Sequence, residues 1–457
     1  MLRRVMLAAG VVAVLASLPA AFVRSTYGGA AAVDEPYYLL PAISLWEDGD
    51  LDIDDELDEA RWRAFHDATL PQQAATREDG SRVSPHDPLL SVLLAVPYEL
   101  GGLTGARWFL AIVNGLLAAA VVHLAVRRLR VRPLLAGCVA AVAGASVPFV
   151  VYGAQVYPEL PAALAVTLAV DAALGAPSPR RSIAVAASVI ALPWLAVKYV
   201  PAAAAIAALH LWRLWRAAER AHVAALAGAY TLAAVTYAMG HLAWYGGLTV
   251  YAAGDFFREH GGQASVVGTA PNPLGRTRRL IGLLVDRDFG IASWQPAWLL
   301  TVPAAASLAR RRPDGAALLG LPLLAGWLSA TFVAVTMHGF WFPGRQLVHV
   351  LPLAAVAVAW WLDRRGRRAL AGAGVVGAWG LAATAALLAG GLAGDLTFVV
   401  DFARANVPGG QLWRRALPDH LIGPPGTTAL TAAWAVALAA TAATVWLSPG
   451  TRRRHRP

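Results

Sequence analysis

Long apolar runs recur along almost the whole chain, and they limit the folds that it can adopt. Each run has roughly 15–23 residues, which is about the length that a helix needs to cross the hydrocarbon layer of a membrane. One such run is compatible with a helix buried in a soluble core, but about a dozen are not. With 58% hydrophobic and only 14% charged residues, the chain also has too few polar side chains to cover a soluble globule. The sequence therefore predicts an all-α polytopic membrane protein.

The basic residues lie in short clusters between the apolar runs, as is typical of the cytoplasmic loops of membrane proteins. The net charge of +10 does not indicate nucleic-acid binding, because no basic stripe with interleaved aromatic residues accompanies it. The clusters are at residues 3–4, 127–132, 180–181, 213–220, 310–312, 364–368 and 452–456. Placing every cluster in the cytoplasm predicts about twelve spans in the cell membrane, with both termini cytoplasmic. The predicted spans are 5–23, 107–126, 134–152, 158–175, 183–197, 199–212, 223–243, 293–309, 315–335, 346–363, 369–392 and 426–447.

This topology treats residues 1–457 as a single transmembrane domain with three substantial outer loops, at 24–106, 244–292 and 393–425. The apolar segment 88–102 is too short to cross comfortably, so we predict a re-entrant or interfacial helix there. The first run also fits a cleaved signal peptide, but the loop after it faces outward in either case. Because the cytoplasmic connections are short, only the outer face has enough polar side chains for a reaction site.

The first outer loop opens with an acidic pair, Asp34–Glu35, followed by Pro36. Pro36 sits where a helix would start, with one of the two acids as its cap. A carboxylate held at the membrane surface beside a helix N-terminus would stay ionised and could accept a proton from a hydroxyl. The pair by itself fits both a helix cap and a general base.

A second acidic run, residues 47–56, begins like a calcium loop. Counted from Asp50, however, Asp55 occupies the glycine position and Arg61 the closing glutamate position, so the run is not an EF-hand. We interpret it as a solvated acidic face with weak attraction for cations.

The loop closes on His86–Asp87. One interpretation is a turn and helix cap before Pro88. The other places the pair across a pocket from Asp34, where it orients a substrate or binds a cation.

Three cationic side chains lie near the outer ends of spans. Lys198, the sole lysine, lies at a turn between two short spans and either extends to the lipid headgroups or binds a phosphate. Arg345 enters the membrane in a glycine-flanked turn, where an anion can approach backbone and guanidinium together. Arg287 lies in another outer segment, before the span 293–309.

In their order along the chain, these features resemble the GT-C superfamily of membrane glycosyltransferases, which includes protein O-mannosyltransferases and lipid A aminoarabinose transferases. The acidic pair follows the first span, and His86-Asp87-Pro88-Leu89-Leu90 is similar to the family's His/Lys-Pro-Pro-Leu segment, with Asp87 in place of the first proline. The other similar segments are Gln155-Val156-Tyr157-Pro158-Glu159, Lys198 between two short spans, Phe289–Gly290 with Pro296, and Gly344-Arg345-Gln346 with Pro352.

The resemblance implies transfer of a sugar from a polyprenyl-phosphate donor to a lipid, glycan or protein acceptor on the outer side, with inversion at the anomeric carbon. It also implies juxtamembrane helices in the first loop. Asp34 would be the general base, and Glu35 would lie near the positive charge that develops on the sugar. Arg345 and Lys198, followed by Arg287, would stabilise the leaving phosphate. The substrate-binding candidates are His86, Asp87, Tyr157 and Glu159.

Cofactors and alternative functions stay open. Some members of the superfamily bind a divalent metal cation and others do not, so Glu35, His86 and Glu159 are candidate ligands. The single cysteine, Cys138, excludes an intramolecular disulfide and a cysteine-based metal site. A secondary transporter and a non-catalytic envelope-assembly protein are the alternatives to an enzyme. The spans carry almost no charge at mid-depth, which favours surface chemistry over transport. The departures from the family pattern at Asp87 and Gln346 leave the donor sugar and the acceptor undecided.

Overall fold

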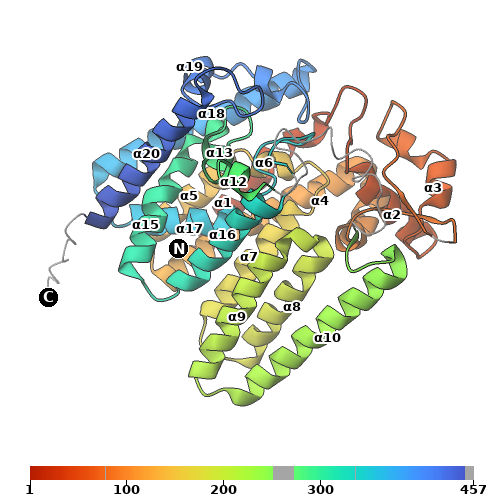
Figure 1. The fold of residues 1–457 in the computed structure, drawn as a ribbon, viewed down its shortest axis with the longest axis horizontal. Coiled ribbons are helices and arrows are strands. Elements are labelled where there is room, and N and C mark those ends of the chain that lie inside the picture. The colour runs from red at the N-terminus through yellow and green to blue at the C-terminus, as the bar shows by residue number, and fades with distance from the viewer. Residues whose placement is uncertain (78, 251–271, 335, 448–457) are drawn as a thin grey trace.

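The computed structural model describes residues 1–77, 79–250, 272–334 and 336–447, and these are mainly helical (Figure 1). The longer helices are α1 (Leu2–Ser17), α2 (Pro36–Glu47), α4 (Leu89–Leu129), α5 (Pro133–Gly144), α7 (Glu159–Leu174), α8 (Pro179–Leu195), α9 (Val200–Arg216), α10 (Arg220–Tyr245), α15 (Thr301–Arg311), α16 (Ala316–Leu328), α17 (Leu351–Leu362), α18 (Arg367–Ala393) and α20 (Thr427–Leu447). Residues 251–271 of the predicted outer loop 244–292 and the basic cluster 452–456 lie outside the described residues.

Shorter elements connect these helices. The short helices and helical turns are η1 (Pro19–Phe22), α3 (Asp54–Asp58), η2 (Arg61–Ala64), α6 (Phe149–Tyr152), η3 (Val197–Tyr199), α12 (Pro273–Arg276), α13 (Arg279–Val285), α14 (Ile291–Trp294), η5 (Pro296–Leu300), η6 (Ser329–Val333), η7 (Phe402–Arg404) and α19 (Gly410–Arg415). Two short strands, β1 (Ala75–Thr76) and β2 (Arg82–Val83), pair antiparallel within the first loop.

Six helical segments in the described part of the chain are long and apolar enough to cross a membrane. They are Leu2–Phe22, Leu89–Leu129, Arg220–Tyr245, Ala316–Val333, Arg367–Ala393 and Thr427–Leu447. Each one overlaps a predicted span, and the other predicted spans correspond to shorter helices such as α7, α8, α9 and α17. The mainly helical, membrane-type fold is confirmed, while the predicted number of about twelve spans stays a prediction.

Local sequence explains where several helices begin and end. Pro133 opens α5 and Pro179 opens α8, because proline has no N–H to leave unpaired in the first turn. Gly246 follows α10 and Gly394 follows α18, and both have a positive φ that closes the helix.

Helix α4 occupies a central position and packs against α1, α2, α5 and α7. Its first part corresponds to the segment 88–102 that was predicted to be re-entrant or interfacial, and this segment is helical. The backbone leaves the helical conformation at Gly101 and Gly102, where Gly102 has φ 56° and ψ −148°. Only glycine adopts that conformation at low cost. The break at these two glycines separates the apolar segment 88–102 from the long span that follows.

The first loop lies at one edge of the molecule, where α2 packs along α4 and α3 lies beside α2 (Figure 1). Helices α8, α9 and α10 form a neighbouring group, with α7 packed against α8 and α16 against α9. At the opposite side, α20 packs against α15, which itself packs against α17. Loops from these three regions meet around the start of α7, which positions the candidate site.

Candidate active site

Arg345 lies at the centre of a buried cluster of charged side chains. Its Nη2 donates to Asp34 Oδ2 at 2.7 Å, and its Nε donates to Glu159 Oε1 at 3.1 Å. Lys198 Nζ donates to the same Glu159 oxygen at 2.7 Å. Two cations and two carboxylates thus form one connected network, which we call the Arg345 cluster (Asp34, Glu159, Lys198 and Arg345).

Glu159, Lys198 and Arg345 lie at ends of predicted spans, and Asp34 lies in the loop that follows the first one. Asp34 follows α1 and η1, and Glu159 is the first residue of α7. Lys198 lies in η3 between α8 and α9, and Arg345 precedes α17. The contacts between them therefore require these four residues to lie on one face of the helix bundle, which is the arrangement that the predicted topology demands.

The turn before Arg345 depends on Gly344. This residue has φ +89°, a conformation that other L-residues rarely adopt. A Cβ atom at this position would also lie only 2.9 Å from Cγ2 of Ile291. Backbone conformation and close packing both require glycine here, and together they set the direction in which the chain presents Arg345.

Aromatic rings surround the guanidinium group. The Cζ of Arg345 lies 4.1 Å from the ring centroid of Tyr157 and 5.3 Å from that of Trp341, within the range of cation–π attraction. The ring of Tyr38 stacks on His86 with centroids 4.3 Å apart and meets Tyr157 edge-on at 6.3 Å. These rings cover part of the cluster, and partial burial strengthens the electrostatic interactions among its charges.

Asp34 and Lys198 are the two members of the cluster that are most accessible. Their side chains keep 19% and 23% of their surface exposed, whereas Glu159 keeps none. Burial alone would raise the pKa of Asp34, but the surrounding positive charges, with Arg345 first, outweigh burial and lower that pKa. Asp34 is therefore ionised at neutral pH and partly exposed, whereas Glu159 is fully buried against the two cations.

His86 stacks on Tyr38, which in turn meets Tyr157 of the aromatic walls. Burial lowers the pKa of its imidazole, which favours the neutral ring at neutral pH. Its Nε2 is buried and has no hydrogen-bond partner in the described part of the chain. This nitrogen is thus available to a substrate group.

Asp87, next to His86 in sequence, contacts residues from two other segments of the chain. Its carboxylate accepts hydrogen bonds from the Tyr237 hydroxyl at 2.9 Å and the Val197 N–H at 3.1 Å, and it lies 2.8 Å from His241 Nε2. Because these contacts use both oxygens in a buried position, Asp87 anchors the first loop to α10 and η3. That it contacts a substrate stays a prediction.

Glu35 points away from the Arg345 cluster into the protein core. Its fully buried carboxylate accepts hydrogen bonds from the Ser25 hydroxyl, from Ala32 N–H at 3.1 Å and from Val156 N–H at 2.8 Å. Arg107 lies 3.8 Å away. This geometry holds Glu35 outside the Arg345 cluster, and a place beside the sugar stays a prediction. Helix α2 does begin at Pro36 as predicted, but no side chain caps its first turn.

We therefore expect Glu35→Gln to damage folding and to leave the reaction chemistry intact. Breaking a buried ion pair on one side costs about 3–5 kcal/mol, so the melting temperature in detergent should fall clearly. Transfer per folded molecule should match that of the wild type. The exposed Glu99→Gln is the matched control with the same change in charge. A normal melting temperature combined with lost transfer would instead indicate that Glu35 takes part in the reaction.

The fold has a counterpart among solved structures. ArnT from Cupriavidus metallidurans in the apo state aligns with 95% of this chain and 71% of its own, with a TM-score of 0.54 and 18% sequence identity. The chain has the ArnT fold. This similarity agrees with the fold that the resemblance to the GT-C superfamily implied.

Two further structures show weaker similarity than the apo ArnT structure. One is the same ArnT bound to undecaprenyl phosphate, with a TM-score of 0.48, 17% identity, and coverage of 95% of this chain and 70% of that chain. The other is the Archaeoglobus fulgidus oligosaccharyltransferase in the apo form, with a TM-score of 0.45, 12% identity, and coverage of 91% and 60%. No protein-family model and no curated protein matches the chain.

In this chain's version of the ArnT fold, Arg287 belongs to a second polar cluster. Its Nη1 donates to Asp419 at 3.1 Å and its Nε donates to the carbonyl of Arg414 at 3.0 Å. The neighbouring Asp286 lies 2.8 Å from Nδ1 of His420. Arg287 thus pairs with Asp419 outside the Arg345 cluster, and its binding of a donor phosphate stays a prediction.

Several residues around the site were not predicted as functional. Tyr38 and Trp341 form aromatic walls, and Arg107 faces Glu35 from inside α4. A signal existed for Arg107, since it lies in the span predicted at 107–126 and a charge within a span usually has a partner. Nothing in the local sequence distinguished Tyr38 and Trp341 from the many interfacial aromatics.

The predicted metal ligands do not form a metal site together. Glu35 is held by core donors. His86 Nε2 and Glu159 Oε2 are buried without partners, but no third ligand joins them among the described residues. In that part of the chain, the one suitable group of three acidic or histidine side chains is Asp48, Asp55 and Glu56, outside the Arg345 cluster.

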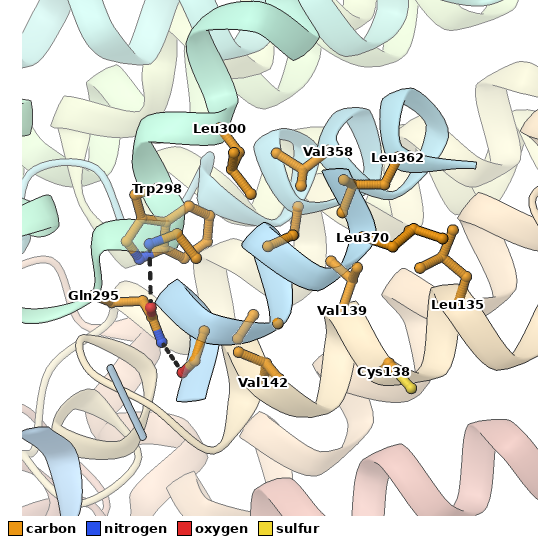
Figure 2. A pocket seen from close by; sticks show the side chains of 16 residues that line it. Leu135, Cys138, Val139, Val142, Gln295, Trp298, Leu300, Val358, Leu362 and Leu370 are labelled. Carbon is orange, nitrogen blue, oxygen red and sulfur yellow. Dashed lines mark hydrogen bonds between the residues drawn. The ribbon is translucent and has the colours of Figure 1, made fainter. Parts of the chain in front are cut away.

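A separate apolar cavity of about 160 Å³ lies among α5, α17, α18 and the segment around η5 (Figure 2). Gln295 forms its polar end and donates to the carbonyl of Gly377 at 3.4 Å and to Ser146 at 3.1 Å. Pro148, close to Ser146 in sequence, packs against Gly344. No member of the Arg345 cluster lines this cavity.

Proposed function

We propose that the chain is a membrane glycosyltransferase that moves a sugar from a polyprenyl-phosphate donor to a hydroxyl of a lipid, glycan or protein acceptor. The observation that carries the proposal is the direct contact between Asp34 and Arg345. In this contact, Asp34 would accept the proton of the acceptor hydroxyl, and Arg345 beside it would stabilise the leaving phosphate. The ArnT fold supports the assignment, and ArnT of C. metallidurans binds undecaprenyl phosphate, which is the class of carrier proposed here.

In the proposed reaction, the acceptor oxygen attacks the anomeric carbon of the donor sugar from the side opposite the phosphate. The bond from that carbon to the phosphate oxygen breaks, and its electron pair stays on the phosphate. The acceptor proton passes to Asp34. The products are the glycosylated acceptor, with inverted configuration, and the polyprenyl phosphate.

The two cations and two carboxylates of the Arg345 cluster balance in charge. This balance links proton transfer to Asp34 with the departure of the phosphate. As Asp34 takes up a proton, it loses the negative charge that holds Arg345. At the same moment the leaving phosphate gains negative charge, and the same guanidinium is available to stabilise it. Such preorganised charge stabilisation is usually the largest single contribution to catalysis.

The remaining residues position the reactants. Lys198 is the second cation for the phosphate, because its side chain is accessible and close to Arg345 through Glu159. Glu159 is a positioning residue that holds both cations. His86 offers its free Nε2 to the sugar or the acceptor. We place this reaction on the outer face of the cell membrane, as the positions of the basic clusters indicate.

Binding of undecaprenyl phosphate to the purified full-length protein tests the proposal without knowledge of the sugar, because this lipid remains after every transfer of this class. We expect wild-type protein to bind it and Lys198→Met to bind it about ten- to a hundredfold more weakly, as loss of one charge-assisted hydrogen bond costs about 1.5–3 kcal/mol. Arg404→Met, which removes an exposed cation elsewhere, should bind normally.

Wild-type protein that fails to bind undecaprenyl phosphate would contradict the proposed donor class. Solute uptake by the same protein in vesicles would then favour the transporter alternative. Equal binding by wild type and Lys198→Met would remove Lys198 from the phosphate site while leaving Arg345 in it.

A further inference from the structure

Three carboxylates converge at the far end of α2, outside the Arg345 cluster. Asp48 directly follows α2, and Asp55 and Glu56 lie in α3. One ligand atom from each lies within 4.8 Å of the others. We call this group the acidic triad (Asp48, Asp55 and Glu56). Carboxylates held so close repel one another unless a positive charge lies between them.

Glu56 distinguishes the acidic triad from a solvated acidic surface, which is what the sequence led us to expect here. Its side chain is only 1% exposed. Neither of its carboxylate oxygens has a hydrogen-bond partner in the described part of the chain. A carboxylate in this position needs a partner, because an unpaired buried charge is costly.

The arginines of the same loop do not supply that partner. Arg61 donates to Glu47 at 2.7 Å, and Arg82 pairs with Asp54 and, at 2.6 Å, with Asp58. Among the described residues, no cation forms an ion pair with a member of the acidic triad. The buried oxygens of Glu56 and the exposed oxygens of Asp48 and Asp55 therefore surround a position that a cation fits.

We propose that the acidic triad binds a calcium ion. Ligands that are all oxygen suit a hard cation, which excludes zinc as the preferred metal. Ca²⁺ accepts several carboxylates at about 2.3–2.6 Å in a flexible geometry, so its ligands fit within the observed spacing. Mg²⁺ usually takes one or two carboxylates and keeps most of its water. Because Asp48 and Asp55 are exposed, water completes the coordination of the calcium ion.

The calcium ion would tie the end of α2 to α3. Asp34 lies two residues before the first residue of α2, and Asp48 directly follows the last one. The ion would therefore hold the far end of the helix that follows the candidate base. This inference does not depend on the proposed function, since it concerns the stability of the first loop and not the reaction.

The test measures the melting temperature of the full-length protein in detergent while CaCl₂ rises from about 0.1 to about 10 mM, a range that brackets the affinities of extracellular calcium sites. We expect the wild-type melting temperature to rise and saturate. Glu56→Gln should need at least about tenfold more calcium for the same rise, which is a loss of about 1.4 kcal/mol. Glu99→Gln, the same change at an exposed position outside the triad, should respond like wild type.

If Glu56→Gln does not fold, Asp55→Asn, a change at an exposed position, takes its place. Equilibrium dialysis with radioactive calcium should show one bound ion per wild-type chain. Two results would overturn the proposal: a wild-type melting temperature that calcium does not change, or variants that respond as the wild type does. An equal response to MgCl₂ would overturn the assignment to calcium.

Discussion

Replacing Asp34 with asparagine is expected to lower kcat for transfer from a polyprenyl-phosphate sugar by about 10²- to 10⁴-fold, the usual contribution of a general base. Asparagine keeps an oxygen for Arg345 but cannot take up the acceptor proton. Arg345 also keeps its contact of 3.1 Å with Glu159, so insertion and folding should be preserved. Transfer of a radiolabelled sugar in membranes that contain equal amounts of wild type and variant measures the loss.

The matched control for Asp34→Asn is Asp67→Asn, which changes an exposed acid of the same loop that pairs with Arg24. This variant should transfer normally. Undiminished transfer by Asp34→Asn would remove Asp34 as the base.

The dependence of transfer on pH provides a second test of the same residue. A base works when deprotonated, so activity is lost as the pH falls through its pKa. Because the pKa of free Asp34 lies below its usual value, kcat/KM should stay constant from about pH 7 to about pH 5. In the donor complex the phosphate shares Arg345, so the acid limb of kcat should lie at higher pH than that of kcat/KM. If kcat/KM instead fell with a midpoint near pH 6.5, the usual range of histidine, this result would contradict Asp34 as the base.

Replacing Arg345 with alanine is expected to have two effects of similar importance. Loss of the guanidinium removes the main stabilisation of the leaving phosphate, which should lower kcat by about 10²- to 10³-fold. It also leaves Asp34 without its ion-pair partner and Glu159 with Lys198 alone. Removal of one partner from a buried pair costs about 3–5 kcal/mol, so the melting temperature should fall as well.

A double variant separates the two effects of Arg345→Ala. Adding Glu159→Gln removes one of the carboxylates that Arg345 neutralised, so we expect part of the stability to return while transfer stays low. Arg345→Lys should retain a charge but not both contacts, because one ammonium group cannot reproduce the two donors of the guanidinium. Normal transfer by Arg345→Ala would exclude Arg345 from the phosphate site, and normal melting would contradict its place in the buried network.

The class of fold could be predicted from the sequence because its signal is local and repeated. Apolar runs of membrane length require helices, since only helices satisfy the backbone inside lipid within one segment. The sequence also showed which kinds of charged side chain the candidate site contains. The acidic pair at Asp34, the sole lysine at Lys198 and Arg345 in its glycine-flanked turn all lie near the predicted ends of spans, where charges are unusual.

Only the tertiary structure decided which of these side chains act together. Asp34 and Glu35 are adjacent in sequence, yet one faces Arg345 and the other faces Arg107, because side chains before a helix diverge by large angles. Asp34 and Arg345 are 311 residues apart, and no local pattern encodes such a contact. For the same reason, Asp87 and Arg287 looked in sequence like side chains free to bind a substrate, since their partners lie on distant segments. Likewise, only folding buried Glu56 beside Asp48 and Asp55.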